Sequence, residues 1–211
     1  VDIAIGVICH TGMHNEHTGG YENDCSLARL SENHYMMIAP TVQQTRCKSW
    51  IRRQLPPVGD HSIHLNDVTS SYTAICIMGP YSRKLLQDLT DTDLSPKNFP
   101  FFTYKELDVG LANGIRTFNL THTGELGYVL YIPNEFALHV YTQLWEKGQK
   151  YEIMHAGYYA TRALRIEKLV SKSNLTDFSP SNIFLVCHVG SGLRLVHNSS
   201  RMWSLLACKI R

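Results

Sequence analysis

The chain has 211 residues, of which 44% are hydrophobic and 18% charged, so it can bury one sizeable core and a smaller annex. Its formal net charge is +2, and no apolar run of about 18 residues occurs, which excludes a membrane-spanning helix. The six cysteines include no C-x-x-C pair, which argues against zinc ribbons and redox dithiols and fits a reducing compartment.

The first part of the chain is predicted to contain a strand, a hairpin and a helix. Residues 1–5 alternate between apolar and polar side chains, as strands do. Ser31-Glu32-Asn33 has the composition of a turn, and Pro40 suits the first turn of a helix. In chain order we expect a strand over residues 1–8, a polar stretch over 10–18, hairpin strands over 26–30 and 34–39, and a helix over 40–55.

The second part interleaves strands with helices. Ala112-Asn113-Gly114 has the composition of a hairpin turn, and Asn134 can cap the helix that follows it. We expect strands over residues 72–78, 101–109, 115–120 and 128–132, and helices over 81–89, 135–150 and 157–169. Hairpins mixed with helices predict an α+β fold.

Three ordered segments carry a resemblance to a known family. They read GGYENDCSLARL (residues 19–30), HTGELGYVLYIP (residues 122–133) and AGYYATRALRIEKL (residues 156–169). Together they resemble the folate-binding domain of glycine-cleavage aminomethyltransferases, which also forms the C-terminal half of dimethylglycine and sarcosine dehydrogenases. The resemblance covers residues 1–169 and implies a partial domain of this type, with antiparallel sheets and flanking helices.

Within that family, the wording HTGM, ANGIR and LRIEK is most similar to a regulatory branch. Members of this branch act on pyruvate dehydrogenase phosphatase in the mitochondrial matrix and lower the sensitivity of its catalytic subunit to magnesium. The resemblance implies that catalytic subunit as the partner, with neither nucleic acid nor a membrane. It implies no cofactor in this region and FAD in a dehydrogenase-like half that precedes it in longer members.

Residues 170–211 differ from the rest and do not look like the expected continuation of the domain. They hold five basic residues against Asp177 alone, dispersed without a dense cluster, so a basic arm for nucleic acid is not favoured. We expect a divergent, poorly ordered tail, which is either a genuine end of this lineage or a product of aberrant splicing or read-through. Because the chain starts at Val1, we also expect it to be a processed or excised piece of a longer protein.

Asp24 is the first candidate site residue. A folate pocket needs an acid for the pterin, cations for the glutamate tail, and a carboxylate near the reacting nitrogens. By resemblance, that reacting carboxylate is the last residue of Gly-Gly-x-x-x-Asp, here Asp24, with Asn23 where the enzymes often have a second acid. The alternative is a turn or capping carboxylate after the Gly19-Gly20 bend.

Three ligand positions of the family are replaced in this chain. The acid expected to read the pterin is Val129, an expected tyrosine is Ala28, and an expected arginine is Thr161. Arg162 follows Thr161, but one residue turns about 100° around a helix, so it does not simply take over. Each buried pterin donor left without an acceptor would cost roughly 1–3 kcal/mol, so tetrahydrofolate binding is doubted.

His122 and Glu125 complete the candidate remnant of the folate pocket. Glu125 matches the Gly-Glu-x-Gly element, and His122 stands where a tyrosine would stack on the ligand. Either residue can instead be structural: Glu125 as a loop carboxylate satisfied by backbone amides or solvent, and His122 as a surface histidine or a satisfied one. His10, His14 and His17 lie close in sequence, but no acid or cysteine completes a metal-binding set, so we expect no metal.

Three readings of function remain open. The favoured one is a non-catalytic regulatory module built on an eroded folate-binding scaffold. The second is a folate-dependent one-carbon enzyme in which tetrahydrofolate binds near Asp24. The third is a truncated product that does not fold stably, because the helix over residues 157–169 would leave apolar surface uncovered.

Overall fold

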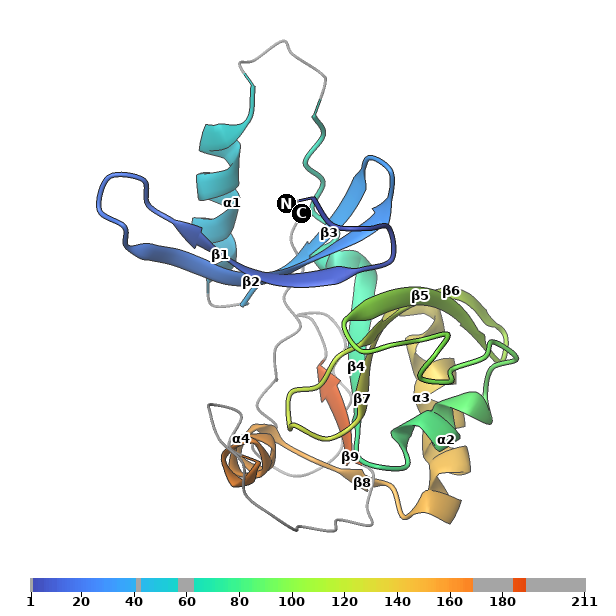
Figure 1. Ribbon diagram of the computed structural model, residues 1–211. Helices are drawn as coiled ribbons and strands as arrows, with labels where there is room; N and C mark the ends of the chain where they lie inside the picture. Colours follow the sequence, from blue (N-terminus) through green and yellow to red (C-terminus); the bar gives the residue numbers. More distant parts are fainter. Residues whose placement is uncertain (1, 41–42, 57–62, 169–183, 189–211) are drawn as a thin grey trace. The chain divides into compact units, whose positions relative to one another are not determined.

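The computed structural model describes residues 2–40, 43–56, 63–168 and 184–188, and its elements are labelled in Figure 1. The described residues divide into two compact units, one formed by those up to residue 71 and the other by those from residue 72 to residue 188. Each unit contains a sheet that is wholly or mainly antiparallel and at least one helix packed on it, so the predicted α+β class is confirmed.

The first unit is a three-stranded sheet with one helix on it. The sheet order is β1-β2-β3, with β1 (Ile8–His14), β2 (Tyr21–Ser31) and β3 (His34–Ile38) all antiparallel. Helix α1 (Gln44–Gln54) lies against one face, and a short 3-10 turn, η2 (Thr69–Ser71), precedes the second unit. Buried Met13 and Cys25 pack against Cys47 of α1, with Trp50 and Ile51 alongside. The predicted hairpin and helix are thus confirmed.

The predicted first strand is wrong in position. Residues 2–4 are not in a strand, and β1 begins at Ile8 and includes residues 10–14 of the predicted polar stretch. Pairing explains the shift, because β1 follows β2 residue by residue from Ile8 opposite Ala28 to Met13 opposite Asn23. Hydrogen bonding to a neighbouring strand therefore outweighs the weak local pattern.

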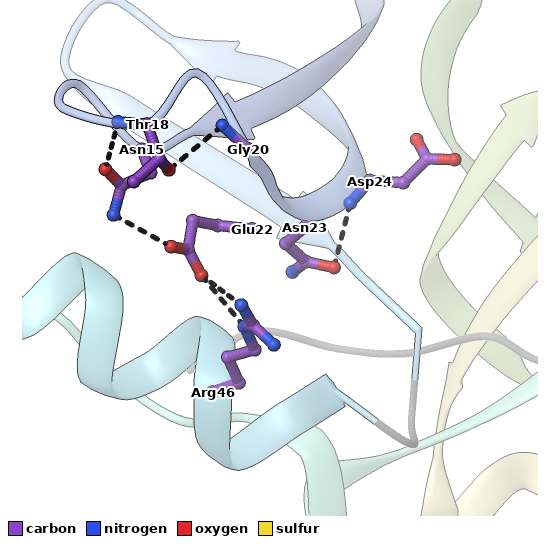
Figure 2. A network of polar contacts seen from close by, with 7 residues as sticks. All are labelled: Asn15, Thr18, Gly20, Glu22, Asn23, Asp24 and Arg46. Carbon is purple, nitrogen blue, oxygen red and sulfur yellow. Dashed lines mark hydrogen bonds and ion pairs between the residues drawn. The ribbon is translucent and has the colours of Figure 1, made fainter.

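A polar network joins the β1–β2 hairpin to α1 (Figure 2). The register skips Glu22, because Met13 faces Asn23 and His14 faces Tyr21, so Glu22 is the extra residue of a β-bulge. Its carboxylate accepts hydrogen bonds from Arg46 Nε at 2.9 Å, Arg46 Nη2 at 2.6 Å and Asn15 Nδ2 at 3.2 Å. These bonds hold the pKa of Glu22 below its usual value, and the bulge thereby fixes the helix to the hairpin.

The second unit is a six-stranded sheet with two helices on one face. The sheet order is β5-β6-β7-β4-β9-β8, antiparallel except for the parallel pair β8 and β9. The strands are β4 (Tyr72–Met78), β5 (Thr103–Val109), β6 (Ala112–Asn119), β7 (Gly127–Pro133), β8 (Met154–His155) and β9 (Phe184–His188). The helices are α2 (Ser82–Gln87), α3 (Ala137–Gly148) and α4 (Tyr158–Glu167), with 3-10 turns η3 (Asn134–Phe136) and η4 (Gln149–Tyr151).

The main core lies between this sheet and helices α2 and α3. Alternate residues of β4 and β7, such as Ile75 and Leu130, meet Leu86 of α2 and Leu144 of α3 in one buried cluster. Their period-2 and helical spacings match the sequence pattern, so the strands and helices predicted for this unit are confirmed apart from details.

Two of those details were wrong. The β5–β6 turn is Gly110-Leu111, not residues 112–114. The backbone N–H of Leu111 donates to His139 Nε2 at 3.0 Å, and Gly114 sits at a bulge where Asp108 Oδ1 accepts its N–H at 2.8 Å. Asn134 does not cap a helix through its side chain, which accepts a hydrogen bond from Thr73 Oγ1 at 3.0 Å instead.

The predicted tail falls mostly outside the described residues. Within residues 170–211 the structure describes only β9, which pairs with β4 and β8. In the described part of the chain, no helix has the length and apolarity needed to cross a membrane. Cys9, Cys25 and Cys47 are free thiols.

Candidate functional site

The loop before β7 carries two of the candidate residues and Gly124, and β7 begins with Gly127. Gly124 has a φ of +78°, a conformation that glycine adopts without strain. A Cβ on Gly127 would collide with Met78 Sδ and lie 3.1 Å from the Leu120 carbonyl oxygen. Both glycines therefore have a structural reason to be there, and the Gly-Glu-Leu-Gly motif alone does not require a ligand.

Glu125 is paired within the unit. Its Oε1 lies 2.5 Å from Lys168 Nζ, just after the end of α4, and its side chain is only 21% exposed. The carboxylate is satisfied neither by backbone amides nor by solvent alone, as the structural alternative supposed, but by a lysine. Reasoning from sequence missed Lys168, for which the only available signal was a lysine at the end of the predicted helix.

His122 is held in its neutral form. Burial is the main cause that lowers its pKa to about 4, and the nearby guanidinium of Arg165 adds to the shift. Arg165 belongs to α4 and Lys168 directly follows it, so this segment places a cation next to each of the two candidate side chains in the loop. His122 is a partly enclosed neutral ring, not the exposed surface histidine of the alternative.

Val129 lies in the middle of the sheet. It is 1% exposed on β7, directly opposite Cys76 of β4 and Phe118 of β6. The ring of Phe118 also meets Tyr131 edge-on, with 5.1 Å between centroids. The position expected to read a pterin is thus aliphatic and flanked by a thiol and a phenyl ring.

Thr161 is also buried, and its hydroxyl is hydrogen-bonded within its own helix. It is 5% exposed on α4, and its Oγ1 donates a hydrogen bond to the Gly157 carbonyl oxygen at 3.1 Å. Arg162 is exposed, with its guanidinium 5.5 Å from the centre of the Tyr158 ring. Arg162 therefore points elsewhere on the helix, as the 100° rotation per residue predicts.

Asp24 and Ala28 belong to the first unit. Asp24 lies within β2, not in a turn, and its Oδ1 is 2.9 Å from His10 Nε2 on β1. The side chains of Asp24 and His10 are 49% and 59% exposed, whereas Ala28 is fully buried between Ile8 and Met36. His10 is the second partner that sequence reasoning missed, because it depends on the β1–β2 register.

The structure thus brings His122 and Glu125 together with α4, and places Val129 and Thr161 in the same unit. Asp24 pairs with His10 in the other unit, and each unit is described by itself. No group of three histidine, cysteine or acidic side chains suited to a metal ion occurs in the described ranges.

Comparisons with known proteins identify the family. A family model described as the GCVT N-terminal domain matches residues 1–181. The chain belongs to this family. The match extends past residue 169, where the sequence resemblance was expected to end.

Curated relatives of this GCVT N-terminal domain include a regulatory subunit and several enzymes. The mitochondrial pyruvate dehydrogenase phosphatase regulatory subunit of Mus musculus is 51% identical over 168 residues, covering 80% of this chain and 19% of the relative. Mitochondrial sarcosine dehydrogenase of Homo sapiens is 32% identical over 177 residues, covering 77% of this chain and 19% of the relative. An aminomethyltransferase of Caldanaerobacter subterraneus subsp. tengcongensis is 29% identical over 160 residues, covering 76% of this chain and 41% of the relative. The chain therefore spans about a fifth of the first two relatives.

Two of the candidate side chains of this GCVT N-terminal domain are not available for acid–base chemistry, because one is paired with a lysine and the other is held neutral. Glu125 is neutralised by Lys168, and His122 lacks a charge at neutral pH. Asp24 with His10 is the pair that solvent reaches, and a carboxylate beside an imidazole can exchange a proton. Arg165, on α4, is a cation that could meet an anionic group of a ligand.

Proposed function

We propose that this chain is a non-catalytic regulatory module of a subunit that tunes the dephosphorylation of the pyruvate dehydrogenase complex. Its partner is the catalytic subunit of pyruvate dehydrogenase phosphatase, and its location is the mitochondrial matrix. The 51% identical relative carries the name of that regulatory subunit, and the more distant relatives are enzymes.

The observation that carries the proposal is the environment of Val129. A pterin ring presents N–H donors that need an acceptor, and Val129 with its neighbours Cys76 and Phe118 supplies no carboxylate. Leaving two such donors unpaired would cost roughly 2–6 kcal/mol, or about one to four orders of magnitude in affinity. The hydroxyl of Thr161 is already used within α4, so it does not replace the missing arginine.

A second candidate function rests on Asp24. A half-exposed carboxylate 2.9 Å from an imidazole suits proton transfer to or from a folate nitrogen. On that basis the alternative is a folate-dependent one-carbon transfer domain of a dimethylglycine or sarcosine dehydrogenase-like enzyme. It would use tetrahydrofolate here and FAD in the preceding half of the longer protein.

Calorimetric titration with tetrahydrofolate separates the two functions. We expect no saturable heat for the wild-type chain at ligand concentrations up to about 1 mM, because the pterin acceptor is missing. Micromolar binding that Asp24→Asn abolishes would establish the enzyme instead. Asp91→Asn is the matched control, since Asp91 is an exposed acid in the second unit.

Binding to the phosphatase tests the favoured function directly. We expect the immobilised chain to capture the purified catalytic subunit and the mixture to require more magnesium for the same phosphatase activity. Unchanged magnesium dependence together with no capture would refute the regulatory proposal.

A further inference from the structure

One hydrogen bond fixes the tip of the β5–β6 hairpin to helix α3. The backbone N–H of Leu111 donates to Nε2 of His139 at 3.0 Å, and the two residues are 28 positions apart in the chain. Leu111 belongs to the two-residue turn of the hairpin, and His139 lies in the first turn of α3. The contact therefore joins the turn between two strands to the start of a helix that packs on the same sheet.

Gly110 allows the imidazole of His139 to come this close to the turn. The φ of Gly110 is +59°, and a Cβ at this position would lie 2.5 Å from Nε2 and 3.3 Å from Cε1 of the His139 ring. Any other residue would therefore strain the backbone of the turn and also displace the ring. The turn and the ring fit each other closely, which makes the hydrogen bond to Leu111 a well-defined contact.

The direction of this hydrogen bond sets the protonation state of the His139 ring. A backbone N–H only donates, so Nε2 must offer a lone pair, and the single proton of the neutral ring must be on Nδ1. A proton added to Nε2 would leave two donors facing each other at the 3.0 Å that now separates the two nitrogens. The contact is therefore made by the neutral imidazole and is incompatible with the imidazolium.

The charges around His139 do not hold the ring against the turn. In the described part of the chain, no ion pair joins His139 to an acid. On the hairpin side, the carboxylate of Asp108 accepts the N–H of Gly114 at 2.8 Å. On the helix side, the positive end of the α3 dipole opposes a positive ring, and Glu135 lies one turn earlier, where an imidazolium can pair with it. A protonated ring is thus drawn away from Leu111.

We propose that His139 and the Gly110-Leu111 turn form a pH-sensitive latch. The neutral ring holds the tip of the hairpin on α3, and a proton taken up at Nε2 releases it, so that the N–H of Leu111 turns to water. Because His139 is partly exposed and histidines titrate between about pH 5 and pH 8, solvent can work the latch in that range. The strand pairing of β5 with β6 does not involve the ring, so only the tip responds. This inference goes beyond the proposed function and does not depend on it.

An NMR titration of the ¹⁵N-labelled 211-residue chain tests the latch. At high pH we expect the ring nitrogen shifts of His139 to show the proton on Nδ1 and a hydrogen-bonded lone pair on Nε2. The amide signal of Leu111 should move with the same midpoint as the ring. Its protection from hydrogen exchange, corrected for the intrinsic effect of pH, should fall about fivefold or more as the ring is protonated. A ring protonated on Nε2 at high pH, or a Leu111 amide that does not follow the ring, would overturn the proposal.

Two substitutions of His139 identify the titrating group. His139→Ala should leave the Leu111 amide unprotected at every pH, and His139→Gln should also remove the pH dependence, because glutamine does not titrate. His34→Gln is the matched control, since His34 is an exposed histidine of the first unit and should leave the titration of Leu111 unchanged. If the pH dependence at Leu111 persists in both His139 variants, it belongs to another group, such as Glu135 or Asp108, and the latch is wrong.

Discussion

His122 should make the second unit sensitive to mild acid. Its pKa is about 4 in the folded chain against an ordinary value of 6.5, so the unfolded chain binds a proton first as the pH falls. The contribution of neutral, buried His122 to the free energy of unfolding is therefore fully present above pH 6.5 and is lost progressively as the pH falls toward 4. For this single group the linkage relation gives a loss of about 2.5 kcal/mol between pH 7.5 and pH 4.5.

The variant His122→Gln isolates that contribution, since glutamine keeps a polar side chain and has no proton to gain in this range. Urea titrations followed by far-UV circular dichroism at pH 7.5, 6.0 and 4.5 would give the free energy of unfolding of both proteins. We expect the wild type to lose about 2.5 kcal/mol more than the variant over that interval, and the carboxylates common to both to cancel.

The reason for the shift can be checked separately by an NMR titration of the His122 ring. Arg165→Leu should raise the pKa of His122 only in part, because burial is the larger cause and the guanidinium the smaller one. A wild-type ring that titrates near 6.5 would show that His122 is open to solvent. The enclosed geometry of the loop beside α4 would then be wrong.

Three further substitutions test the packing. Gly127→Ala should lower the free energy of unfolding by about 1–3 kcal/mol in urea titrations, because the new Cβ meets Met78 Sδ. Phe118→Ala should cost about 3–5 kcal/mol in the same assay, because the ring is fully buried. Arg46→Ala should lower the melting temperature of the first unit, because Arg46 stabilises the ionised form of Glu22. This decrease in melting temperature should become smaller as the pH falls below the usual pKa of Glu22, where the carboxylate becomes protonated.

The fold could be predicted where the spacing of apolar residues and the composition of the adjoining turns indicate the same element. The strand over residues 72–78 and the hairpin around residues 31–33 have both signals, and the structure has them at those places. The position of β1 could not be predicted, since its pattern is weak and its register depends on β2. The β5–β6 turn was misplaced because Gly114 serves a bulge stabilised by Asp108, a contact that leaves no local sequence signal.

The candidate site was predictable in its positions but not in its pairings. The resemblance pointed to Glu125 and Asp24, and the structure gives each a partner from a different element, Lys168 and His10. Such partners depend on strand register and on where a helix ends, which are tertiary facts. The burial of His122 is of the same kind, because a histidine in a polar loop reads as exposed until α4 is placed beside it.

The ion pair between Glu125 and Lys168 should be measurable as a coupling energy. The two side chains are 21% and 33% exposed with 2.5 Å between the charged atoms, so the pair is neither fully solvated nor deeply buried. We expect a coupling of about 1 kcal/mol from a double-mutant cycle of Glu125→Gln and Lys168→Met, at the upper end for surface pairs. Amide hydrogen exchange along α4 should speed up in both single variants, because the helix buries only Thr161 otherwise.

Salt provides the control for that measurement, since screening at high ionic strength should reduce the coupling and leave the cost of Thr161→Ala unchanged. A coupling near zero at low salt would mean that Lys168 does not anchor the helix to the loop. A vanishing coupling would therefore leave α4 with Thr161 as its buried residue and without an effective ion pair to the loop, even if the loop itself kept its shape through Gly124 and Gly127.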